Sequence, residues 1–151
     1  MTMEVVGVVF RAPNRPGDFG WMRRQPEWAD ALFIFNDNEA QFRAFQEGRP
    51  EGCSPGGGNA RIRSWRCEDP PRAAGIPTGD AGGYAALTPH VESVLDDAFA
   101  VISDLLATGR YSKVVYSAET PDGQLGTSIF SPGPDVVQTI TDRLKSLATP
   151  G

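Results

Sequence analysis

Ala31-Leu32-Phe33-Ile34-Phe35, followed at once by Asn36-Asp37-Asn38, is the stretch of sequence that decides the fold. Five consecutive apolar residues that stop at an amide are typical of a central strand that is buried on both faces of a sheet. Residues 39–47 then place their apolar side chains on or near one helical face, and Gly48 suits the end of that helix. A buried strand that leads directly into a helix is the repeating unit of α/β proteins.

The same patterns predict further elements along the chain. Apolar, β-branched runs predict strands at 3–11, 73–76 and 113–118, and the alternation of polar and apolar residues predicts a half-exposed strand at 61–65. Helices are expected at 89–108, with Thr88 as N-cap, and at 134–148, with a brief helical turn within 21–29. Strands that alternate with helices predict one α/β domain over residues 1–151 with a mostly parallel sheet.

Size and charge limit the classes of function. The chain has 151 residues and a formal net charge of −5. An acidic protein is a poor general binder of duplex nucleic acid, although Arg61, Arg63, Arg66 and Arg72 lie close enough in sequence to form a local basic patch. No apolar run is long enough for a membrane span, and the N-terminus does not resemble a signal peptide, so we expect a cytoplasmic protein.

Two cysteines and one histidine are too few for a metal site of the usual four ligands, so no metal and no cofactor are expected. Cys53 and Cys67 leave two alternatives open. They could form a disulfide, but the thiols of a cytosolic chain are normally kept reduced. His90 has no nucleophile beside it in sequence, so we do not expect it to be a catalytic base.

Polar, glycine-rich segments occur where apolar runs end, and ligands of α/β sheets bind beyond the carboxyl ends of the strands. The candidate segments are Gly17-Asp18-Phe19-Gly20, Asn36-Asp37-Asn38, Gly56-Gly57-Gly58-Asn59, Ile76-Pro77-Thr78-Gly79 and Gly126-Thr127-Ser128-Ile129-Phe130.

Each segment has a ligand-binding and a structural interpretation. The amides at 36–38 suit ribose hydroxyls, but Asp37 or Asn38 could equally cap the helix that follows. The glycines at 56–58 could turn backbone amides toward phosphates, or could form a flexible loop. Residues 126–130 could bind an anion or form an ordinary β–α loop, and Thr78 could line the same edge or sit in a tight turn.

The order of these segments resembles the macrodomain family. That resemblance implies a three-layer α/β/α fold that binds ADP-ribose and related nucleotides. It implies that Asp18, beside Phe19, holds the adenine amino group, and that Asn36 and Asn38 lie near the distal ribose. The glycines 56–58 with Asn59 would flank that ribose and the phosphates, and residues 126–130 would form a second phosphate loop.

A second pattern is similar to uncharacterised small proteins of bacteria and their viruses: Phe35-Asn36-Asp37-Asn38, Gly57-Gly58-Asn59-Ala60 and Ala74-Gly75-Ile76-Pro77-Thr78. It implies no established activity, although a viral protein that sequesters an immune signal of ADP-ribose type would suit a domain of this size.

Three hypotheses of function follow. The first is a reader or sequestering protein for an ADP-ribose-type nucleotide, linear, cyclic or conjugated. The second is a hydrolase of ADP-ribosyl or ADP-ribose phosphate esters, in which Asn36 or Asp37 would hold the attacking water. The third is a protein-interaction domain without a small ligand, in which the glycine-rich loops would enclose no pocket. The sequence does not indicate the oligomeric state.

Overall fold

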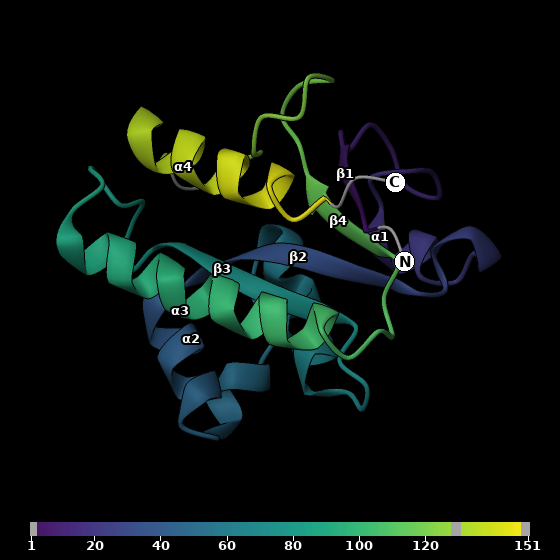
Figure 1. Cartoon of the computed structure of the whole chain (residues 1–151), viewed down its shortest axis with the longest axis horizontal. Coiled ribbons are helices and arrows are strands. Elements are labelled where there is room, and N and C mark those ends of the chain that lie inside the picture. Colours follow the sequence, from purple (N-terminus) through teal and green to yellow (C-terminus); the bar gives the residue numbers. More distant parts are fainter. Residues whose placement is uncertain (1–2, 128–130, 149–151) are drawn as a thin grey trace.

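A four-stranded parallel sheet forms the centre of the molecule in a computed structural model, which describes residues 3–127 and 131–148 (Figure 1). The strands are β1 (Glu4–Val8), β2 (Ala31–Asn38), β3 (Ala73–Gly79) and β4 (Lys113–Ser117). Their order across the sheet is β1-β4-β2-β3, and every neighbouring pair is parallel. β3 is buried along its whole length and β2 is buried from Ala31 to Phe35, as expected for strands covered on both faces.

Two layers of helices cover the sheet, so the fold is a three-layer α/β/α arrangement (Figure 1). On one face lie α3 (Pro89–Leu106) and α4 (Pro134–Lys145), which pack against alternate β2 residues such as Leu32 and Ile34. On the other face lie α1 (Phe19–Met22) and the 3₁₀ helices η1 (Pro26–Trp28) and η3 (Gly58–Cys67), which pack against Phe33 and Phe35. Successive strand residues point to opposite faces, which explains the unbroken apolar run at 31–35.

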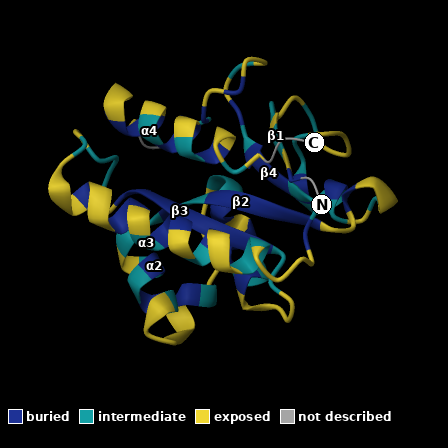
Figure 2. Ribbon diagram, viewed as in Figure 1, coloured by how far each residue is buried: buried dark blue, intermediate teal, exposed yellow. Residues whose placement is uncertain are grey.

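The remaining helix, α2 (Glu39–Gln46), follows β2 and packs beside β3, and the 3₁₀ helix η2 (Pro50–Cys53) packs against α2 and η3. Phe42 of α2 joins Val94 and Ala98 of α3 in a small apolar cluster, so α2 is tied to the α3 layer. Buried residues therefore run through the sheet and the inward sides of the helices, whereas the outer helix faces are exposed (Figure 2).

The structure confirms the α/β class, the parallel sheet and the helices expected at 39–47, 89–108 and 134–148, within a few residues at their ends. Residues 21–29 contain part of α1 and all of η1, where a helical turn was expected.

The strand predicted at 61–65 is wrong, because this segment belongs to the 3₁₀ helix η3. A 3₁₀ helix has three residues per turn, so residues three apart lie on one side. Arg63 and Arg66 have this spacing, and both are buried. Ile62 and Trp65 have it too: Ile62 is buried in the core, and Trp65 packs against the same core. The charged residues thus point inward, which the alternation of a half-exposed strand did not predict.

Cys53, at the end of η2, and Cys67, at the end of η3, form a disulfide. Of the two alternatives for these cysteines, the structure therefore shows the disulfide and not the reduced thiols expected of a cytosolic chain. The cytoplasmic location stays a prediction. Among the helices of residues 3–127 and 131–148, none has the length and apolar character needed to cross a membrane.

Candidate functional site

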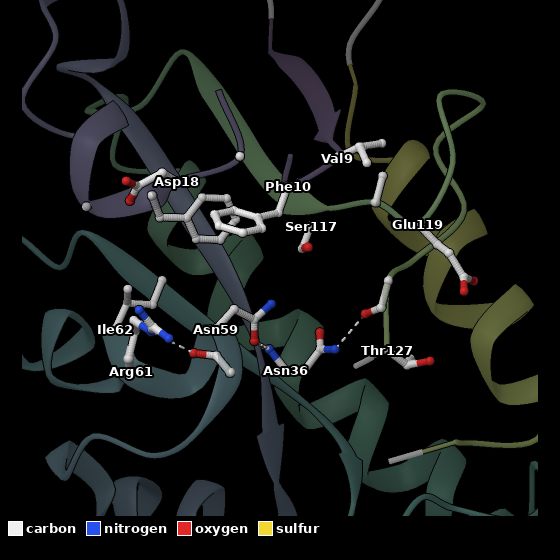
Figure 3. A pocket seen from close by; sticks show the side chains of 16 residues that line it. Val9, Phe10, Asp18, Asn36, Asn59, Arg61, Ile62, Ser117, Glu119 and Thr127 are labelled. Atoms are coloured by element: carbon white, nitrogen blue, oxygen red, sulfur yellow. Dashed lines mark hydrogen bonds between the residues drawn. The ribbon is translucent and has the colours of Figure 1, made fainter. Parts of the chain in front are cut away.

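A cavity of about 420 Å³ opens at the carboxyl ends of β1, β4 and β2 (Figure 3). Val8 of β1 pairs with Ser117 of β4, so these two strands end at the same level, and Asn36 lies near the end of β2 beside them. Ligands of parallel sheets bind at this edge. Its lining comes from four separate parts of the chain: Val9, Phe10, Gly17, Asp18, Phe19, Gly20, Asn36, Gly58, Asn59, Arg61, Ile62, Ser117, Ala118, Glu119, Gly126 and Thr127.

The segment after β1 forms an aromatic and acidic wall of the cavity. Phe19 is buried beneath this wall. Phe10 is 57% exposed, and among the described residues it is the one large apolar residue that is exposed. Asp18 caps α1: its carboxylate accepts hydrogen bonds from the Trp21 and Asn14 backbone N–H groups, at 3.2 and 2.9 Å. These bonds, the one from Asn14 first, lower the pKa of Asp18, so the wall carries an ionised carboxylate at neutral pH.

Two amide side chains form the opposite wall. The Asn36 Nδ2 group donates to the Gly126 carbonyl oxygen at 2.7 Å, and the Asn59 Oδ1 atom accepts from the Asn36 backbone N–H at 2.9 Å. These bonds join the end of β2 to both the start of η3 and the 126–127 segment. Asn36 and Asn59 are therefore brought together with Gly58, Gly126 and Thr127 at one cavity, and a ligand there stays a prediction.

Asp37, the neighbour of Asn36, lies in a different environment. Its side chain is 0% exposed and bonds to two arginines: Oδ1 accepts from Arg63 Nε at 3.0 Å and Oδ2 accepts from Arg66 Nη1 at 2.6 Å. Both oxygens of the Asp37 carboxylate are therefore occupied by guanidinium groups. Asp37 does not line the cavity, so its geometry favours a structural role over the catalytic role considered from the sequence.

Both arginines are satisfied in their buried positions. Arg63 donates to the Ser54 carbonyl oxygen, and Arg66 donates to the carbonyl oxygens of Gly52 and Gln41. Buried charges are tolerated when they are paired and fully hydrogen-bonded, as here. We call Asp37, Arg63 and Arg66 the ion cluster; it fixes residues 52–66 against β2, and thereby fixes the cavity wall that this segment carries.

The glycine run at 56–58 has two functions in the structure. A side chain at Gly56 would place its Cβ 2.7 Å from Arg63 Nη1, and one at Gly75 would place its Cβ 2.8 Å from Asp37 Oδ2. These two glycines therefore make room for the ion cluster. Gly57 is the residue before η3, and Gly58, of the three glycines at 56–58, lines the cavity.

Several other predicted ligand residues lie away from the cavity. Asn38 caps α2, since its side chain accepts from the Gln41 backbone N–H at 2.8 Å, which is the structural alternative weighed for it. Thr78 is buried at the end of β3 and is not part of the lining. Ser128, Ile129 and Phe130 lie outside the residues that the structure describes.

Sequence reasoning missed some of the lining. Arg61 is exposed at the cavity, where its Nε donates to the Gly58 carbonyl oxygen at 3.1 Å. The basic patch that the sequence allowed does not form from these four arginines: Arg63 and Arg66 are buried, and Arg72 donates to the carbonyl oxygens of Ala31 and Trp28. Ser117 and Glu119 at the end of β4 also line the cavity, and their position directly after a buried strand was the available signal.

Neither a family model, nor a curated protein, nor a solved structure matches this chain significantly. The resemblance to macrodomains therefore rests on the order of the sequence segments, and the function has to be argued from the geometry of the cavity.

Proposed function

We propose that this chain binds an ADP-ribose-type nucleotide in the cavity at the carboxyl edge of its sheet, as a reader or a sequestering protein. The observation that carries the proposal is the cavity itself, which has a volume of about 420 Å³ and is lined by segments 17–20, 36, 58–59 and 126–127. Small-molecule sites are commonly clefts of roughly 300–1,000 Å³ with apolar walls and a few placed polar groups. These segments are far apart in sequence, and the sequence pattern singled out each of them independently.

One wall of the cavity has the chemistry to hold a nucleobase. The exposed Phe10 ring can stack on an aromatic base, a contact that buries apolar area on both partners. The ionised Asp18 carboxylate accepts two backbone hydrogen bonds and has further lone pairs for an exocyclic amino group. An adenine-like base satisfies both features.

The other wall has groups suited to sugar and phosphate. Asn36 and Asn59 carry amides that bind hydroxyl groups, and Arg61 is an exposed cation beside them. Guanidinium groups bind phosphate oxygens in a bidentate manner, with charge-assisted hydrogen bonds. A ligand with a base at one end and phosphates and ribose at the other would therefore match the cavity from wall to wall.

The arrangement favours binding over the two alternatives. A hydrolase needs a group that can activate water, and the Asp37 carboxylate is sequestered by Arg63 and Arg66. A protein-interaction domain predicts that the glycine-rich loops enclose no pocket, whereas Gly17, Gly58 and Gly126 all line one.

Isothermal titration of the purified protein with ADP-ribose, AMP, NAD and cyclic dinucleotides tests this function. We expect ADP-ribose to bind, and Arg61→Ala to weaken it by about 10- to 100-fold through the loss of a charge-assisted contact. Arg110→Ala, at an exposed arginine just before the opposite end of β4, is the matched control and should leave the affinity unchanged. If a folded sample binds none of these nucleotides, the proposal fails. Chromatography of the same mixtures would reveal turnover and so favour the hydrolase.

A further inference from the structure

The amides of Asn36 and Asn59 each have one end anchored to a backbone group. A carbonyl oxygen only accepts hydrogen bonds, so the Asn36 atom that bonds to the Gly126 carbonyl, at 2.7 Å, must be the donor Nδ2. A backbone N–H only donates, so the Asn59 atom that bonds to the Asn36 N–H, at 2.9 Å, must be the acceptor Oδ1. The backbone thus removes the usual ambiguity in the orientation of an amide side chain.

The opposite ends of the two amides face the cavity. Figure 3 shows the Asn36 Oδ1 atom and the Asn59 Nδ2 group directed toward its open part, on the wall opposite Phe10 and Asp18. Within residues 3–127 and 131–148, neither of these two atoms has a hydrogen-bond partner. This wall therefore presents one acceptor and one donor whose identities are fixed by the fold.

We propose that Asn36 and Asn59 act as an oriented amide pair that selects a ligand with an adjacent hydrogen-bond donor and acceptor. This inference rests on the proposed function and specifies which ligand group binds at the amide wall of that site. The ligand donor meets Asn36 Oδ1, and the ligand acceptor meets Asn59 Nδ2. A buried site made of fixed donors and acceptors rejects ligands that lack the matching groups, because the unmatched site atoms would lose their water without a replacement partner.

Two parts of a nucleotide offer this chemistry. The vicinal hydroxyls of a ribose supply one O–H donor and one oxygen acceptor on neighbouring carbons. The edge of adenine supplies an amino donor beside a ring-nitrogen acceptor. The two sources are separated below by ligand analogues.

Asn59→Asp is the informative variant. An aspartate keeps the Oδ1 acceptor for the Asn36 N–H, and therefore keeps the structural hydrogen bond, but it replaces the cavity donor by a second oxygen. We expect the free energy of unfolding to stay near that of the unmodified protein and the affinity for ADP-ribose to fall at least about tenfold. Asn59→Ala removes both functions, and should lower the affinity and the stability together.

Three analogues of ADP-ribose keep both phosphates and their charge: a hypoxanthine base, a 2′-deoxyadenosine ribose, and a methyl ester in place of the distal ribose. Each is titrated into the unmodified protein and into Asn59→Asp. The group that Asn59 binds is the one whose alteration abolishes the effect of the substitution, as in a double-mutant cycle. The added carboxylate charge affects all four ligands alike, so it cancels. Equal losses for all four ligands would overturn the proposal.

A separate measurement tests the oriented amide pair even if ADP-ribose itself does not bind. The ¹⁵N NMR signal of the Asn59 side-chain amide is followed while adenosine, ribose 5-phosphate or nicotinamide is added at millimolar concentration. A selective shift of that signal with any of the three supports the oriented pair even where the proposed nucleotide is wrong. No shift with any of them overturns the pair.

Discussion

The two faces of the sheet are covered in different ways. The face under α3 and α4 is covered by long helices whose apolar residues form the larger core, including Leu95, Ile102 and Ile140 at 0% exposure. The opposite face, under α1, η1 and η3, is covered by short helices, and we call it the pocket face. Most of its outer segment, residues 50–67, is 3₁₀ helix. Long amphipathic helices gain stability from packing along one face, whereas short 3₁₀ turns have poor hydrogen-bond geometry and depend on tertiary contacts.

The pocket face replaces regular secondary structure with specific anchors. The ion cluster of Asp37, Arg63 and Arg66 holds the 52–66 segment against β2, and the Cys53–Cys67 disulfide links η2 to η3. The contrast between the two faces indicates where a binding site can form in a small α/β domain. The helical face supplies stability, and the irregular face can bring separated polar groups to one cavity because its shape is set by a few strong contacts.

Disruption of the ion cluster should have the largest effect on the free energy of unfolding. Asp37→Ala leaves two buried guanidinium groups without their counter-ion, and removal of one partner of a buried ion pair typically costs about 3–5 kcal/mol. Urea unfolding followed by circular dichroism measures the change. Hydrogen exchange should show faster exchange in residues 52–67, with α3 and α4 less affected.

Leu95→Ala is the matched control on the other face, because Leu95 is fully buried in α3. It should destabilise the protein by roughly 2–5 kcal/mol, with the fastest added exchange in α3 instead. Asp37→Ala combined with Arg63→Met and Arg66→Met should recover part of the lost stability, since it removes the unpaired charges. A loss below about 1 kcal/mol for Asp37→Ala alone would show that the cluster does not hold the pocket face.

The same contrast explains what the sequence could predict. The apolar periodicity of α3 and α4 and the buried run at 31–35 report local structure directly, and the structure confirms them. In residues 58–67 the decisive partners lie elsewhere in the chain. Arg63 and Arg66 bond to Asp37, which is 26 and 29 residues away. Local alternation could not reveal these partners, so the segment was predicted as a strand.

The candidate site shows the same division. Asp18, Asn36, Gly58, Asn59, Gly126 and Thr127 follow apolar runs or lie in polar loops, and the structure brings them to one cavity. Asn38 and Thr78 have the same residue types at the same kind of position, yet one caps α2 and the other is buried. Sequence identifies which residues lie at the carboxyl edge of the sheet. Which of them face the cavity depends on the packing of α2, η3 and the loop after β4.

Removal of the disulfide should have an intermediate effect on the free energy of unfolding. Its cysteines are 14 residues apart in sequence. A cross-link that closes a loop of about 15 residues contributes roughly 3 kcal/mol by restricting the unfolded chain. Urea unfolding with and without reductant, together with the Cys53→Ser/Cys67→Ser variant, measures this. We expect the reduced protein to remain folded, because the ion cluster still holds the segment. Unfolding on reduction alone would mean that the disulfide is the dominant anchor of the pocket face.

The smallest effect concerns a salt bridge at the edge of the pocket face. Arg23 donates to both carboxylate oxygens of Glu68, each at 2.9 Å, and its guanidinium lies 4.4 Å from the centre of the Trp65 ring. The hydrogen bond from Arg23 is the main cause that lowers the pKa of Glu68. The side chains of Arg23 and Glu68 are 25% and 40% exposed, and such pairs contribute only about 0.2–1 kcal/mol.

The pH dependence of that contribution follows from the direction of the pKa shift. A carboxylate with a lowered folded-state pKa stabilises the protein above the unfolded value, about 4.3 for glutamate, and loses this contribution as the pH falls through the folded-state pKa. Glu68→Gln should therefore lower the free energy of unfolding at pH 7 by about 0.5 kcal/mol and have a smaller effect near pH 3. Glu4→Gln, on the exposed β1 residue, is the control and should change stability less at pH 7. An equal effect of Glu68→Gln at both pH values would show that the Glu68 side chain does not act through its charge.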